Sequence, residues 1–207
     1  MTTFYIIRHG QTTANAQDLK QGTINTAITH LNDVGEQQAQ ALHAAFDISF
    51  ADRLICSPLA RTQETAAILN HGRDLPIKTD SRLLEISYGQ WDVQKNDQLK
   101  VTYPQYFDQA LRDVLPTYVE VATKGETFDQ VIARAQDFLN SMAQQYPTEK
   151  IIVVTHGFTV KAMALAVLQP QNPMSLPEPE NTSVTKITVD SALDRSYLTY
   201  YNRQVGY

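Results

Sequence analysis

Two apolar runs, far apart in the sequence, each end in a histidine followed by a glycine. Phe4-Tyr5-Ile6-Ile7 leads into Arg8-His9-Gly10, and Lys150–Thr155 leads into His156-Gly157. Runs of β-branched and aromatic residues predict buried strands of a mostly parallel sheet. In an open parallel sheet, ligands bind outside the carboxyl ends of the strands. Both histidines are therefore expected at the same edge of one sheet.

A third strand is predicted at Arg53–Cys56, and it brings an arginine to the same edge. Ser57-Pro58 follows this strand and predicts a helix with serine at the N-cap and proline at the first helical position. The helix is expected to run to about Asn70, with Arg61 one turn from its start. A single histidine or arginine in such a position is more often structural or solvated. Together, two histidines and two arginines describe an anion pocket that contains a nucleophile.

The rest of the chain continues the alternation of strands and helices. Asn32 predicts a helix N-cap, Thr127 and Gln130 have the spacing of a capping box, and a further helix is expected near residues 158–168. Two late alternating runs, 183–189 and 196–201, predict antiparallel or edge strands. The pattern predicts an α/β protein, a three-layer α/β/α sandwich with a mostly parallel sheet. We expect a single domain over residues 1–207, with a helical excursion at about 90–124 and a proline-rich surface loop at 170–179.

Composition narrows the classes of partner. The chain has 207 residues, 43% hydrophobic, with a formal net charge of −5, so neither nucleic acid nor a membrane is expected as a partner. An anionic substrate must then be attracted by local positive charge. Cys56 is the single cysteine, which excludes an intramolecular disulfide. No signal-peptide pattern and no apolar run near the ~18 residues of a membrane span is present, and a cytoplasmic protein is expected.

Five blocks of the sequence resemble, in order, the motifs of the histidine phosphatase (phosphoglycerate mutase-like) superfamily. The first is similar to R-H-G-E/Q-S/T-x-x-N, and the others are similar to the S-P-L-x-R, L-x-E, G-E-S/T and final H-G motifs. The blocks are Arg8-His9-Gly10-Gln11-Thr12 with Asn15, residues 57–66 (SPLARTQETA), residues 84–91 (LEISYGQW), Gly125-Glu126-Thr127 and residues 153–157 (VVTHG).

The resemblance implies a phosphatase-type member with the site at the sheet edge. His9 would be the nucleophile that becomes phosphohistidine, and Glu85 the proton donor. The phosphate would be bound by Arg8, Asn15, Arg61, His156 and Gly157, with His156 as an imidazolium. Such a cation clamp needs no metal and no cofactor. The expected partner is a small phosphorylated metabolite, and the sequence is compatible with a homodimer.

Departures from the mutase branch favour hydrolysis over transfer. Ile86 follows Glu85 where mutases carry arginine, Phe158 stands in place of asparagine, and Arg112-Asp113 replaces an arginine pair. Phosphoglycerate mutase stays an alternative, as does a non-catalytic phosphate-binding regulatory protein. A protein phosphatase is also open, because the aromatic excursion could accept a peptide. Substrate specificity is expected to lie in residues 21–31 and 90–124.

Overall fold

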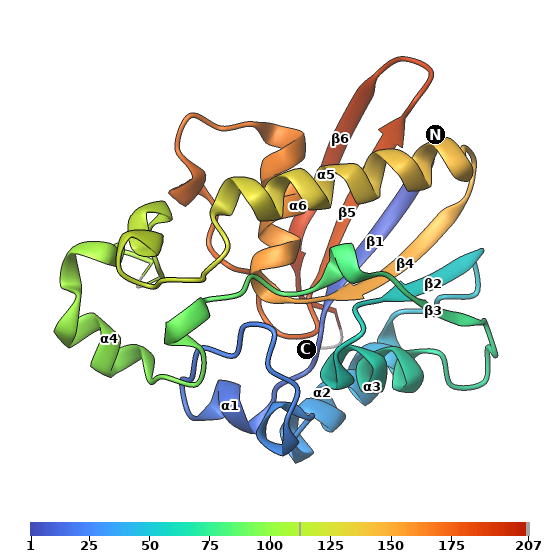
Figure 1. The fold of residues 1–207 in the computed structure, drawn as a ribbon. Helices are drawn as coiled ribbons and strands as arrows, with labels where there is room; N and C mark the ends of the chain where they lie inside the picture. Colours follow the sequence, from blue (N-terminus) through green and yellow to red (C-terminus); the bar gives the residue numbers. More distant parts are fainter. Residues whose placement is uncertain (112, 206–207) are drawn as a thin grey trace.

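The computed structural model describes residues 1–111 and 113–205, which fold around a six-stranded sheet (Figure 1). The order across the sheet is β3-β2-β4-β1-β5-β6. Strands β1 to β4 pair in parallel, whereas β5 is antiparallel to β1 and β6 is antiparallel to β5. The predicted mostly parallel sheet with late antiparallel strands is confirmed. The strands are β1 (Thr2–Arg8), β2 (Arg53–Cys56), β3 (Ile77–Thr79), β4 (Lys150–Thr155), β5 (Val184–Asp190) and β6 (Arg195–Arg203).

The register of the central strands explains why the predicted site residues meet. Arg8 at the end of β1 pairs with Thr155 at the end of β4, and Cys56 at the end of β2 pairs with Val154. The chain therefore leaves all three strands at nearly the same level of one sheet edge. His9, Ser57 and His156, which follow those strands directly, emerge side by side.

Helices cover both faces of the sheet. On one face α5 and α6 pack Phe138 and Phe158 into the cluster that contains Phe4 of β1; on the other, α2 and α3 pack Leu42 and Leu69 against β2 and β4. Burying each such side chain contributes roughly 1.5–3 kcal/mol. The three-layer prediction is confirmed. The helices are α1 (Thr13–Ala16), α2 (Asp33–Ala45), α3 (Ala60–Leu69), α4 (Asn96–Thr102), α5 (Phe128–Gln145) and α6 (Gly157–Leu168).

The predicted caps are confirmed in two helices and wrong in a third. Asn32 caps α2 through its side chain, and Thr127 forms the capping box of α5 with Gln130. The helix predicted to begin at Ser57-Pro58 instead begins at Ala60, with Leu59 at its N-cap. The reason is a competing partner, because the hydroxyl oxygen of Ser57 lies 2.8 Å from His156 Nε2. The Ser57 hydroxyl therefore forms a hydrogen bond with His156 at the sheet edge and does not cap α3.

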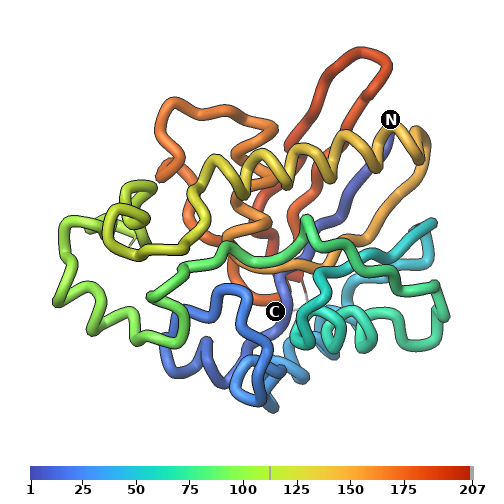
Figure 2. Tube along the Cα trace, viewed as in Figure 1, coloured from blue at the N-terminus to red at the C-terminus, as the bar shows by residue number. Residues whose placement is uncertain are grey.

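The excursion between β3 and α5 is built of short helices and extends from one end of the sheet (Figure 2). Its aromatic residues pack on one another: the rings of Trp91 and Phe107 stack with centroids 5.7 Å apart, and Tyr118 is fully buried. These rings are buried and form a local core, whereas Tyr103 and Tyr106 are half-buried. Position 112 lies outside the described residues. The 3-10 helices of the chain are η1 (Ala27–Thr29), η2 (Ser81–Leu83), η3 (Gly89–Trp91), η4 (Pro104–Tyr106), η5 (Pro116–Glu120) and η6 (Pro173–Ser175).

Candidate active site

A cavity of about 480 Å³ opens at the carboxyl ends of β1 and β2. Five residues predicted from the sequence lie on its wall: Arg8, His9, Asn15, Arg61 and Glu85. The rest of the wall comes from segments 18–22 and 177–181 and from the excursion. Two further predicted residues, His156 and Gly157, are not among the described residues that line it, and His156 lies behind Arg61.

His9 is held as a neutral imidazole with a defined tautomer. Its Nδ1 lies 2.7 Å from the carbonyl oxygen of Gly10, and since a carbonyl can only accept, Nδ1 carries the proton. Nε2 is therefore unprotonated, and its lone pair accepts a hydrogen bond from Arg61 at 3.2 Å. Burial lowers the pKa of His9 well below its ordinary value, and the positive charges of Arg61 and Arg8 lower it further. A neutral imidazole with an unprotonated Nε2 is the form that can attack phosphorus.

Arg61 connects both histidines to the loop before α2. Its Nε–H is shared between His9 Nε2 and His156 Nδ1, each at 3.2 Å. The two terminal nitrogens donate to the carbonyl oxygens of Ile24 and Gly22, at 3.0 and 2.9 Å. The side chain is fully buried, and burial lowers the pKa of this guanidinium to about 10, so it stays charged at neutral pH.

His156 lies between Arg61 and Ser57. It accepts the Arg61 hydrogen bond at Nδ1, so a neutral ring carries its proton at Nε2 and donates to Ser57 Oγ. Burial and the charge of Arg61 lower the pKa of His156 well below its ordinary value. In this arrangement His156 is neutral, because a second cation beside Arg61 in a buried position is unfavourable. The imidazolium expected with bound phosphate stays a prediction.

The proline-rich loop, expected at the surface, contributes to the site. Arg8 donates to the carbonyl oxygen of Pro179 at 2.5 Å, while Arg8 Nε is buried and has no hydrogen-bond partner among the residues that the structure describes. A Cβ added to Gly157 would lie 2.5 Å from Glu178 Oε2 and 3.1 Å from Arg8 Cζ, so the glycine leaves room for both side chains. Burial and the nearby Asp113 carboxylate raise the pKa of Glu178 to about 7. The sequence prediction missed Glu178 because its segment reads only as a polar, proline-rich loop.

Asn15 and Asn181 support the loop that carries His9. Asn15 Oδ1 accepts from the backbone N–H and the hydroxyl of Thr12, at 3.2 and 3.1 Å, and the side chain lies on the cavity wall. Asn181 donates from Nδ2 to the carbonyl oxygen of His9 at 2.8 Å. Gln21, whose contact could not be assigned from the sequence, also lines the cavity and accepts from Thr12 Oγ1 at 3.0 Å.

Glu85 is oriented by the first turn of α6. Its Oε1 accepts from the backbone N–H of Ile86 at 3.0 Å and of Thr159 at 3.2 Å. Its Oε2 accepts one long hydrogen bond, 3.3 Å, from the N–H of Phe158. Free N–H groups at a helix N-terminus favour a negative group. Oε2 has the fewer contacts of the two oxygens, and it is the one with capacity to exchange a proton with a ligand in the cavity.

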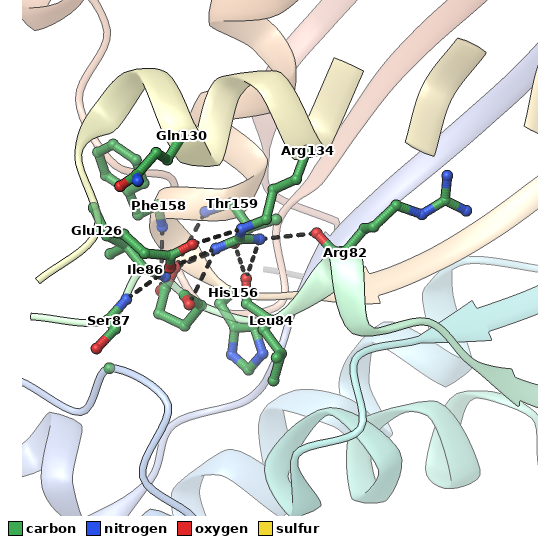
Figure 3. Close-up of polar contacts among 12 residues, drawn as sticks. Arg82, Leu84, Ile86, Ser87, Glu126, Gln130, Arg134, His156, Phe158 and Thr159 are labelled. Carbon is green, nitrogen blue, oxygen red and sulfur yellow. Dashed lines mark hydrogen bonds and ion pairs between the residues drawn. The ribbon is translucent and has the colours of Figure 1, made fainter. Parts of the chain in front are cut away.

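Arg134 of α5 supports the segment that carries Glu85 (Figure 3). Its guanidinium donates to the carbonyl oxygens of Arg82 and Leu84, at 2.8 and 2.6 Å, and to that of Glu85 at 3.1 Å. It also pairs with Glu126, whose carboxylate accepts from the N–H of Ser87 at 3.0 Å. Glu126 was found in the sequence only as part of a motif, and Arg134 was not found at all.

Within residues 1–111 and 113–205, no group of three or more histidine, cysteine, aspartate or glutamate side chains is arranged to hold a metal ion. Among the helices of the same residues, none is long and apolar enough to cross a membrane.

Comparisons with known proteins show the family and the fold of the chain. The family model described as histidine phosphatase superfamily (branch 1) matches residues 4–201. The adenosylcobalamin/alpha-ribazole phosphatase of Escherichia coli is 29% identical over 152 residues, covering 73% of this chain and 72% of that protein. Phosphoserine phosphatase 1 of Hydrogenobacter thermophilus is 26% identical over 168 residues, covering 81% and 77%. The solved structure of Bacillus stearothermophilus YhfR matches with a TM-score of 0.84 at 30% identity, covering 99% of this chain and 98% of that one.

Proposed function

We propose that this chain, which belongs to the histidine phosphatase superfamily and is a phosphoric monoester hydrolase, acts on small phosphorylated metabolites through a phosphohistidine on His9, without a metal. One observation carries the proposal: His9 keeps its proton on Nδ1, against the Gly10 carbonyl, so its Nε2 is unprotonated and accepts a 3.2 Å hydrogen bond from the Nε–H that Arg61 shares with His156. A nucleophile so placed needs no separate base.

The reaction would proceed in two steps. His9 Nε2 attacks phosphorus, the bond from phosphorus to the ester oxygen breaks, and Glu85 gives its proton to the leaving alkoxide. Glu85, now ionised, then takes a proton from water, whose oxygen attacks phosphorus and releases His9 and inorganic phosphate. Arg8 and Arg61 would neutralise the equatorial oxygens in both steps, since phosphoryl transfer depends chiefly on positioning and charge stabilisation.

The shared hydrogen bond of Arg61 supports its role with phosphate. One N–H divided between His9 and His156, at 3.2 Å to each, is a weak donor to both. A phosphate oxygen would accept that hydrogen more strongly, and its arrival would free His9 Nε2 for attack. Arg8 Nε is buried without a partner within residues 1–111 and 113–205, and it would gain one by the same event.

The test is replacement of His9. His9→Ala should abolish phosphate release while the thermal melt shows a folded protein, and wild-type enzyme quenched during turnover should carry an acid-labile, base-stable phosphoryl group on His9. His30→Ala is the matched control, because His30 is a half-exposed histidine paired with Glu64 outside the cavity. A screen of phosphorylated metabolites, with a parallel mutase assay on 3-phosphoglycerate, separates hydrolysis from transfer. Near-normal turnover by His9→Ala would refute the proposal.

A further inference from the structure

Lys20 places an incompletely partnered ammonium group on the wall of the cavity. The exposed fraction of its side chain is 8%. Its Nζ lies 3.7 Å from Asp113 Oδ1 and 4.4 Å from the centre of the Tyr88 ring. No hydrogen bond joins this nitrogen to any residue that the structure describes, although an ammonium has three donors. The remaining donors of Lys20 are therefore available to an acceptor on the cavity side.

Asp113 does not neutralise Lys20 fully, because it is shared. Its other oxygen, Oδ2, lies 3.4 Å from Nζ of Lys161. Lys161 is fully buried in α6, with its ammonium 5.7 Å from the centres of the Phe128 and Phe158 rings. One carboxylate therefore serves two ammonium groups. Because the Lys161 ammonium is buried, it needs the Asp113 carboxylate as its counter-ion and holds it in place. Asp113 in turn fixes the position of the Lys20 ammonium.

The backbone around Lys20 is fixed as well. The N–H of Lys20 donates to the carbonyl oxygen of Gln94 at 3.0 Å, and its own carbonyl accepts from the N–H of Val93 at 2.7 Å. The residue thus joins the segment after α1 to the start of the excursion. The two backbone hydrogen bonds hold the main chain of Lys20 in place, and its ammonium lies between the Tyr88 ring and the Asp113 carboxylate. A positively charged donor in a defined position can discriminate between ligands.

We propose that Lys20 determines substrate specificity by donating a hydrogen bond to an oxygen acceptor, a hydroxyl or a carboxylate, on the alcohol part of the phosphomonoester. Asp113 and Lys161 act as positioning residues. The inference rests on the proposed function, since it assigns the phosphate to Arg8 and Arg61 and the leaving alcohol to the part of the cavity beside Lys20. Glu178 and Glu180 also line the cavity and can accept from a hydroxyl. The favoured substrates are esters of small polar alcohols, not alkyl or ammonium-terminated ones.

The test compares esters of equal size that differ in one oxygen. 2-Hydroxyethyl phosphate is matched with propyl phosphate, and 3-hydroxypropyl phosphate with butyl phosphate; phosphoglycolate represents the carboxylate and phosphoethanolamine the ammonium. Wild-type enzyme should show higher kcat/KM for the oxygen-bearing member of at least one pair. Lys20→Met should lower that ratio by roughly 10- to 100-fold, the usual value of a hydrogen bond to a charged donor. Asp113→Asn should lower the same ratio by a smaller factor.

Lys78→Met is the control. Lys78 is exposed in β3 and is not among the residues that line the cavity, so the ratio should change by less than about twofold. Thermal melts establish that each variant is folded. If Lys20→Met affects both members of every pair equally, or if wild type prefers phosphoethanolamine, the inference is overturned.

Binding separates this inference from the proposed function. In a His9→Ala background, calorimetry should find the same preference for the oxygen-bearing esters and its loss with Lys20→Met. Preferential binding without turnover by the wild type would support Lys20 and refute the proposed function. If the wild type hydrolyses the esters but the ratio of kcat/KM within each pair is unchanged in Lys20→Met, the proposed function is supported and the inference about Lys20 is refuted. Failure of every ester to bind would refute both.

Discussion

Replacing Glu85 by glutamine changes proton chemistry more than geometry. A glutamine can place its amide oxygen where Oε1 lies and keep the hydrogen bonds from the N–H groups of Ile86 and Thr159. Its NH₂ group then faces the N–H of Phe158, and the 3.3 Å bond is lost. One long hydrogen bond is worth about 1 kcal/mol or less, so the variant should fold with the side chain close to its native position.

The expected loss of rate therefore reports on proton transfer. With an alkyl phosphate the leaving alkoxide needs a proton, and turnover of Glu85→Gln should fall by roughly 10²–10⁴-fold, the usual contribution of general acid–base catalysis. With p-nitrophenyl phosphate the leaving group departs without a proton, so formation of phosphohistidine should be affected much less. Hydrolysis of that intermediate stays slow, because water lacks its base.

The assay is a stopped-flow measurement of nitrophenolate beside quenched-flow measurement of alcohol release. Glu85→Gln should show a burst of nitrophenolate, approaching one equivalent per site, followed by a slow steady state. The alkyl ester should show no burst. Equal slowing of the first step with both esters would mean that Glu85 positions phosphate and does not transfer a proton, and the assignment would be wrong.

Three further predictions concern the metal, the buried histidines and Arg134. Excess EDTA should leave the rate almost unchanged; a loss that a divalent ion restores would contradict the arginine clamp. His9 and His156 have lowered pKa values in the folded state, so the stability they confer is present above pH 6.5 and is lost below it, by about 1 kcal/mol for each histidine between pH 6.5 and 5.5. Urea unfolding should show a smaller acid loss in His9→Ala. Arg134→Met should lower kcat for alkyl esters by up to about 10²-fold through misplacement of Glu85, with a smaller effect on the nitrophenolate burst.

The parts of the fold that the sequence predicts well are those decided by local pattern. The strand at Arg53–Cys56 and the strand at Lys150–Thr155 have the predicted bounds, because an unbroken apolar run bounded by polar residues has few alternatives. The capping box at Thr127 is confirmed for the same reason: it depends on residues three positions apart. The meeting of His9 and Arg61 also followed from a local pattern, combined with one rule of topology.

What escaped prediction depends on partners distant in sequence. Ser57 fits an N-cap by local pattern, but His156, 99 residues away, takes its hydroxyl. Glu178 lies in a loop whose composition indicates only exposure, and it reaches the cavity because Gly157 leaves room. Lys20 is similar: nothing around it in the sequence indicates burial, which results from Asp113 and Tyr88. Tertiary contacts override composition at each of these positions.

Arg61 forms hydrogen bonds both with the two histidines of the site and with the loop at 21–31, so the position of the histidines depends on that loop. Its terminal nitrogens hold the carbonyl oxygens of Gly22 and Ile24 at 2.9 and 3.0 Å, while its Nε–H is divided between the two rings. The terminal bonds are shorter and unshared, so they fix the guanidinium plane; the shared bond is the one that a ligand can take over. An arginine can do both because its donors form a rigid fork. The loop that contributes Gln21 and Gly22 to the cavity wall thus also sets the position of the Arg61 guanidinium.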